Sequence, residues 1–158
     1  GKIKNRVGLR PCMPPRGTRA NKSSSVMKYK EITGQIIDCA YKVHKTLGFG
    51  FLESVYQNAL LHELNKNGLS AHKEQKVQVI YDDQVVGDFA ADIVVQDRII
   101  LELKSIQDLH PAHEAQLNNY LKATGMEVGL LINFGWELEV KRKINSSFAK
   151  QDSCCVRC

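Results

Sequence analysis

Three charged residues interrupt two otherwise apolar stretches of this sequence. Glu102 and Lys104 lie within RIILELKSI, and Asp92 lies within FAADIVV. Alternation along a β-strand places Glu102 and Lys104 on the same face. Two carboxylates brought side by side repel each other unless a cation lies between them, and a hard ion such as Mg²⁺ prefers oxygen ligands of this kind. A lysine beside such an ion can orient a water molecule or stabilise a phosphoryl transition state.

The pairing of the two strands decides whether the carboxylates meet. A two-residue turn at residues 96–97 predicts that Asp92 lies opposite Leu101. A one-residue bulge or slip sets Asp92 beside Glu102 instead. In the alternative interpretation, Glu102 and Lys104 face solvent on an edge strand, where charges discourage aggregation. The three residues alone leave both interpretations open, because chance matches to so short a pattern are common.

Hydrophobic periodicity predicts the elements that carry these residues. Helices are predicted over residues 29–47, 51–67 and 111–123. Strands are predicted over residues 77–81, 85–95, 98–104 and 127–134, and a short helix or strand over residues 141–144. This order predicts an α/β fold with helices flanking a central mixed sheet. Phe134 and Trp136, near the end of the last long strand, are predicted to lie in the core, with base-stacking platforms as the alternative.

Composition narrows the class of protein. The chain has 158 residues, of which 43% are hydrophobic and 25% charged, which fits one globular domain with a sizeable core. Its apolar runs are shorter than the ~20 residues needed to span a bilayer, and the N-terminal residues lack the pattern of a secretory signal. We therefore expect a soluble intracellular protein, in the cytoplasm or with the DNA of a nucleoid or nucleus, and no membrane partner.

The two ends of the chain differ from its middle. Residues 1–28 hold eight of the 22 lysines and arginines and none of the 17 acidic residues. Their prolines and serines predict a disordered basic leader, with an arm for nucleic acid as the alternative. Residues 148–158 contain three cysteines without the spacing of a zinc site and are predicted to be a disordered Cys-rich tail with free thiols. The folded domain is then residues 29–147.

The charged residues and the element order resemble the PD-(D/E)XK nuclease superfamily. Asp92, followed by ELK (Glu102–Lys104) on the next strand, resembles its signature, and Ala91 stands where the signature has proline. The order of elements is similar to the αβββαβ core of that superfamily, a restriction-endonuclease-like fold. The departure at Ala91 affects a structural position only, so each metal-binding and catalytic position of the signature is matched.

Two further motifs resemble the GxxExxY family within this superfamily. GFLESVY supplies Gly50, Glu53 and Tyr56, and HEAQLNNYL supplies Gln116 and Tyr120, before VGLLINFG. The resemblance covers about residues 30–144. It implies that Gln116 and Tyr120 lie beside the active site or the substrate backbone. From the residues alone, Glu53 could equally be a surface acid at a helix start, and Gln116 and Tyr120 a boundary pair over the core.

The resemblance also implies a role for each charged residue. Asp92, Glu102 and the backbone carbonyl of Leu103 would hold Mg²⁺, for which Mn²⁺ can substitute, and Glu53 would lie near the metal. Lys104 would act on the attacking water. The implied function is metal-dependent hydrolysis of phosphodiester bonds in nucleic acid, with DNA as the expected substrate and a homodimer as one expected assembly. The alternative is a non-catalytic nucleic-acid-binding or protein-interaction module on a nuclease fold.

Overall fold

A five-stranded mixed sheet forms the centre of the fold, with its strands in the order β1-β2-β3-β4-β5. The computed structural model describes residues 22–145. The strands are β1 (Ala71–Tyr81), β2 (Gln84–Val95), β3 (Ile99–Lys104), β4 (Val128–Phe134) and β5 (Leu138–Ile144). The first three strands form an antiparallel meander, β3 and β4 run parallel, and β5 returns antiparallel to β4. The predicted mixed sheet is thus confirmed, and the segment around residues 141–144 is a strand.

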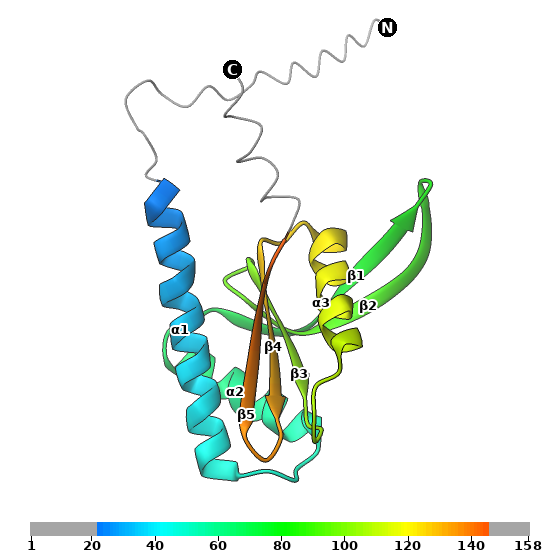
Figure 1. The fold of residues 1–158 in the computed structure, drawn as a ribbon. Coiled ribbons are helices and arrows are strands. Elements are labelled where there is room, and N and C mark those ends of the chain that lie inside the picture. The colour runs from blue at the N-terminus through cyan, green and yellow to red at the C-terminus, as the bar shows by residue number, and fades with distance from the viewer. Residues whose placement is uncertain (1–21, 146–158) are drawn as a thin grey trace, which may run out of the picture.

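Helices cover both faces of this sheet, as predicted. The helices are α1 (Lys22–Leu47), α2 (Glu53–Lys66) and α3 (Pro111–Thr124). Figure 1 shows α1 and α2 on one side of the sheet and α3 on the other. Each side has its own hydrophobic core, because Leu101 and Leu103 pack toward α1 and α2, whereas Ile100 packs beneath α3. Helix α3 is the crossover between the parallel strands β3 and β4.

Two elements begin six or seven residues before their predicted positions. Helix α1 begins at Lys22, before the predicted start at residue 29, because a helix already stabilised by packing is extended at little cost through serines. Strand β1 begins at Ala71, before the predicted residue 77. Its first residues are polar and resemble a loop in sequence. Residues 1–21 of the predicted leader, the whole predicted tail (148–158) and residues 146–147 of the predicted domain lie outside the described residues. Residues 22–28 of the predicted disordered leader are helical instead.

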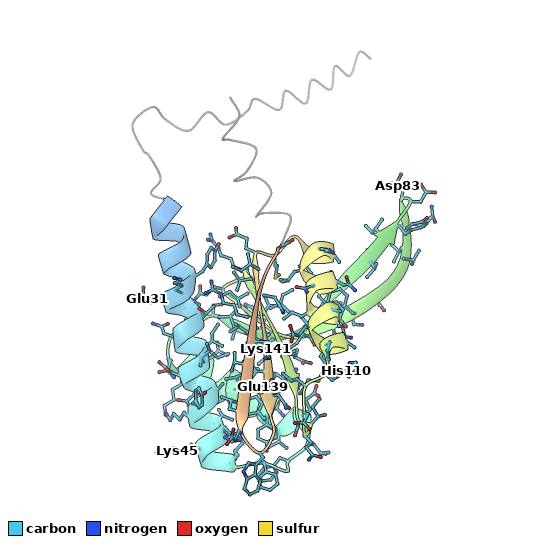
Figure 2. All side chains as sticks on the ribbon, viewed as in Figure 1. Glu31, Lys45, Asp83, His110, Glu139 and Lys141 are labelled. Atoms are coloured by element: carbon cyan, nitrogen blue, oxygen red, sulfur yellow. The ribbon has the colours of Figure 1, made fainter. Side chains whose placement is uncertain are left out.

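Strands β1 and β2 extend past the sheet as a two-stranded arm. Figure 2 shows Asp83 at its tip, where Asp82 and Asp83 both have positive φ angles, of 49° and 58°. A tight hairpin turn requires this left-handed conformation, which aspartate tolerates better than most residues. Within residues 22–145, no helix combines the length and the apolarity needed to cross a membrane.

Candidate active site

The turn between β2 and β3 sets the register that the site depends on. It comprises three residues, 96–98, rather than the predicted two. Ile93 consequently lies opposite Leu101. In this register Asp92 comes level with Glu102. The predicted pairing of Asp92 with Leu101 is therefore wrong, and the one-residue slip considered beside it is the arrangement observed.

Beyond Ile93 the two strands separate, and the Asp92 side chain bridges them. Its Oδ2 accepts a hydrogen bond of 2.7 Å from the Leu103 N–H. Because the N–H and C=O of one strand residue point to the same side, the Leu103 carbonyl is also directed toward Asp92. The backbone carbonyl of Asp92 accepts a hydrogen bond of 2.8 Å from Gln57 Nε2 on α2. The position of Asp92 is thus fixed from both β3 and α2.

Glu102 is a buried carboxylate that lacks a full set of partners. It is 7% exposed, and among residues 22–145 its Oε1 finds no hydrogen-bond partner. Burial first, and then repulsion from Asp92, raise the pKa of Glu102 from 4.5 to about 8. Strand β3 is the central strand of the sheet, so the alternative of a solvent-facing edge strand is wrong. Burying a carboxylate with one oxygen left unpaired costs free energy, which a cation at this point would offset.

Lys104 and Glu53 complete the charged cluster. Lys104 follows Glu102 by two positions on β3, and its positive charge opposes the rise in the pKa of Glu102. Glu53 is the first residue of α2. Partial desolvation and then the charge of Asp92 raise the pKa of Glu53, and Lys104 lowers it. These mutual effects place four of the predicted site residues within electrostatic reach of one another.

Tyr120 and Gln116 join the cluster from α3. Gln116 Nε2 donates a hydrogen bond of 2.5 Å to Tyr120 Oη. Burial, and then the negative charge of Glu102, raise the pKa of the Tyr120 hydroxyl. The Tyr120 ring stacks on Phe89 of β2, with ring centroids 3.7 Å apart. Helix α3 therefore holds a tyrosine hydroxyl beside the acidic residues.

Sequence reasoning assigned no role to two buried polar residues that support the cluster. Gln57 shares the α2 face of Glu53 and holds the Asp92 backbone. Asn133 pairs in register with Lys104 and is 1% exposed. Its side chain bonds both the N–H and the carbonyl of Ile106, at 3.0 and 2.9 Å, and so fixes the segment that follows Lys104. A polar residue inside the apolar run GLLINFG was the available signal.

The donor set fits a hard divalent cation that takes few protein ligands. Within residues 22–145, no group of three or more histidine, cysteine, aspartate or glutamate side chains is arranged to hold a metal. The pair Asp92 and Glu102 and the Leu103 carbonyl offer oxygen atoms only, the ligands that Mg²⁺ prefers. Mg²⁺ usually keeps several waters and needs only one or two protein carboxylates. The partnerless Glu102 Oε1 is the feature that such an ion would satisfy.

A protein-family model and solved structures match this chain. The family model described as the PD-(D/E)XK nuclease superfamily matches residues 30–145. One similar solved structure is entitled "Crystal structure of SSO0001", with 16% identity, a TM-score of 0.49, and coverage of 86% of this chain and 70% of that one. Another is an alkaline exonuclease from Laribacter hongkongensis, with 10% identity, a TM-score of 0.41, and coverage of 72% of this chain and 81% of that one. No curated protein matches the sequence.

The matched residues include all five strands of the sheet, among them β2 and β3, which carry Asp92 and Glu102. They also include helices α2 and α3, which flank the charged cluster. The family model covers well over half of the chain. The chain therefore belongs to the PD-(D/E)XK nuclease superfamily.

Proposed function

We propose that this chain is a metal-dependent nuclease that hydrolyses phosphodiester bonds in DNA. The observation that carries the proposal is the buried Glu102, with its partnerless Oε1, beside Asp92 and Lys104. A buried carboxylate with an unpaired oxygen lowers the stability of the folded chain unless something binds it. Carboxyl groups with strongly shifted pKa values are typical of active sites. The motif formed by Gly50, Glu53 and Tyr56 supports a finer assignment to the GxxExxY family.

In this proposal the acidic residues hold the cofactor. Asp92, Glu102 and the Leu103 carbonyl would hold Mg²⁺ or Mn²⁺, and Glu53 would lie near the ion. When bound, the cation would neutralise charge at the phosphate and lower the pKa of a water molecule. The Asp92 carboxylate has a second task, because its bond to Leu103 N–H keeps the two strands in position.

Lys104 and the α3 pair act on the substrate. Lys104 orients the attacking water and stabilises negative charge on the phosphate. The water oxygen bonds to phosphorus and releases a proton to solvent, the P–O bond to one sugar oxygen breaks, and that oxygen takes up a proton from solvent. The products are a phosphomonoester and a hydroxyl. Tyr120 Oη, held by Gln116, donates a hydrogen bond to the phosphate backbone next to the scissile bond.

A cleavage assay with matched glutamate variants tests this function. The purified chain is incubated with single-stranded, duplex and branched DNA and with RNA, in Mg²⁺, Mn²⁺ or EDTA. We expect cleavage of DNA that requires metal and is lost in Glu102→Gln. Glu63→Gln is the matched control, because Glu63 is buried to a similar degree and lies outside the charged cluster.

Two results would overturn the proposal. Cleavage that is unchanged in Glu102→Gln would remove this cluster from the reaction. Metal-dependent binding of nucleic acid without any cleavage would favour the non-catalytic module on a nuclease fold.

A further inference from the structure

A cavity of about 680 Å³ opens directly beside the charged cluster. Its walls come from the loop between α1 and α2, from the segment that follows Lys104, and from the turn between β4 and β5. Glu53 belongs both to this cavity and to the candidate active site. Anything that occupies the cavity therefore lies next to the proposed scissile phosphate.

Three large aromatic side chains of the cavity are exposed. Phe49, Phe51 and Trp136 are 56%, 47% and 73% exposed, so the prediction of Trp136 as a core residue is wrong. The rings of Phe49 and Trp136 lie 4.5 Å apart and are tilted by 57°. Exposed aromatic groups that gather around a concavity are typical of binding sites, because burying them there is favourable.

Hydrogen bonds hold the aromatic loop before any ligand binds. The buried Tyr56 donates from its hydroxyl to the Gly48 carbonyl at 2.6 Å and accepts from Phe51 N–H at 3.3 Å. Ser105, directly after Lys104, donates to the Phe51 carbonyl at 2.9 Å. The loop is thus tied both to α2 and to the segment leaving β3. A preorganised wall of this kind loses little entropy on binding.

The turn between β4 and β5, which forms the opposite wall of the cavity, is also held in place. A Cβ added at Gly135, next to Trp136, would lie 2.7 Å from the Ile106 carbonyl, so only glycine allows this approach. His44 Nε2 lies 2.8 Å from the Gly135 carbonyl. The turn that carries Trp136 is therefore fixed against both α1 and the Ile106 segment.

The chemistry of the cavity selects an uncharged, flat group. Of the described residues that line the cavity, none is basic, and Glu53 is the one that carries a charge. A negatively charged phosphate is disfavoured there, whereas any of the nucleobases can stack on aromatic rings. Bases in a duplex are already stacked on one another and reach such a pocket only after they are unpaired.

We propose that this aromatic cavity receives unpaired nucleobases of the strand that is cut, so that the substrate is single-stranded DNA or a duplex with an unpaired end or flap. This inference rests on the proposed nuclease function, since it names the substrate class of the same site. Phe49 and Trp136 form the stacking platform, and Glu53 marks the point where the strand passes from the cavity to the charged cluster.

Trp136 is the only tryptophan of the chain, so its fluorescence reports on the cavity directly. The protein is titrated in EDTA with an oligothymidylate, with an abasic strand of equal length and charge, and with a duplex. We expect the oligothymidylate to quench Trp136 fluorescence and to bind at least about fivefold more tightly than the abasic strand, as one stacked base would require. Equal binding of both strands without quenching would overturn the proposal.

Variants measured by anisotropy of a labelled strand supply the matched comparison. Trp136→Ala and Phe49→Ala should each weaken binding of single strands about fivefold or more, and Trp136→Phe should restore it. Tyr81→Ala is the control, because Tyr81 is 75% exposed on the β1–β2 arm, away from the cavity. An equal loss in Tyr81→Ala, or no loss in Trp136→Ala, would contradict the assignment.

The two proposals fail separately in this design. Stacking measured in EDTA needs no cleavage, so quenching without any nuclease activity would leave the cavity assignment and remove the catalytic one. Metal-dependent cleavage that is unaffected by Trp136→Ala would support the catalytic assignment and remove the cavity assignment. If Trp136 fluorescence changed with protein concentration alone, and Phe49→Ala abolished that change, the occupant would be a second copy of the chain and the nucleobase proposal would be wrong.

Discussion

Glu63 and Glu102 are buried to almost the same degree but have opposite electrostatic surroundings. They are 9% and 7% exposed, respectively. Glu63 Oε1 accepts hydrogen bonds from Lys42 Nζ at 2.6 Å and from Asn67 Nδ2 at 3.2 Å, and these contacts lower its pKa. Glu102 has a partnerless Oε1 and a pKa raised to about 8.

The difference separates a structural carboxylate from the one that we propose to be functional. Glu63 links α1 to α2, and its partner Lys42 is 58% exposed, so this ion pair contributes little to stability. Glu102 lowers the stability of the chain as long as nothing binds it. Burial alone therefore does not identify an active-site acid. In our proposal the distinguishing feature is the partnerless Oε1 of Glu102, which a cation would satisfy.

The largest expected effect comes from Asp92, which combines both kinds of role. Asp92→Asn retains an oxygen that accepts from Leu103 N–H but loses the charge, so we expect at least about a hundredfold less cleavage with near-normal stability. Asp92→Ala should lose the same activity and in addition about 1–3 kcal/mol of unfolding free energy, because a buried N–H loses its partner. Initial rates and urea denaturation measure the two effects. Equal stability of the two variants would contradict the structural role.

The next largest effect is expected from Lys104, for which Lys42 is the matched comparison. Lys104→Ala should reduce cleavage about a hundredfold, since the positioned cation near the attacking water is lost. Lys42→Ala, which removes the partner of Glu63, should leave the cleavage rate unchanged. Single-turnover rates with saturating enzyme measure the chemical step. Equal losses in both variants would mean that Lys104 acts only on folding.

The two glutamates should also give the stability of the metal-free protein opposite pH dependences. Between pH 4.5 and about 8 the folded chain holds a proton on Glu102 that the unfolded chain has released. The contribution of Glu102 to the free energy of unfolding is therefore largest below pH 4.5 and falls by a few kcal/mol as the pH rises to about 8. Glu63 has a lowered pKa, so its contribution is present above 4.5 and is lost as the pH falls through the folded value.

Thermal unfolding in EDTA across this pH range measures both trends. Glu102→Gln should remove the decline toward high pH and leave the acid side unchanged. Glu63→Gln should remove the loss on the acid side only. A decline that persists in Glu102→Gln would assign the titration to another group and break the comparison.

The smallest expected effect is at Tyr120. Tyr120→Phe keeps the stacking on Phe89 and loses the hydroxyl that Gln116 holds. Loss of one such hydrogen bond to substrate should lower the cleavage rate about fivefold with little change in stability. Gln116→Ala should give a smaller reduction in the same direction. A rate unchanged in Tyr120→Phe would show that the ring only covers the core.

The sequence drew attention to Asp92 and Glu102 because both break strong local patterns, whereas Glu53 was indicated only by the family resemblance. A carboxylate within an apolar strand has no local explanation, so Asp92 and Glu102 stand out without any structure. The helix and strand order was equally accessible, because long periodic segments dominate the chain. The sequence did not determine the register between β2 and β3. The length of the turn at residues 96–98 depends on backbone conformation, which composition does not specify.

The supporting residues could not be predicted, because their partners are distant in sequence. Gln57 and Asn133 are ordinary polar residues until the fold brings them to Asp92 and Ile106, which are 35 and 27 positions away. Trp136 shows the converse limit. Its hydrophobicity predicts burial, and only the tertiary structure distinguishes a core ring from an exposed one beside a cavity.

Calorimetric titration with Mn²⁺ tests most directly whether the unpaired carboxylate is a metal site. The wild-type chain, Glu102→Gln and Glu63→Gln are titrated at one neutral pH in two buffers of different ionisation enthalpy. We predict binding with proton release in the wild type and in Glu63→Gln, because Glu102 must lose its proton to bind the ion, and no binding in Glu102→Gln. Undiminished binding in Glu102→Gln, or an equal loss in Glu63→Gln, would contradict the account.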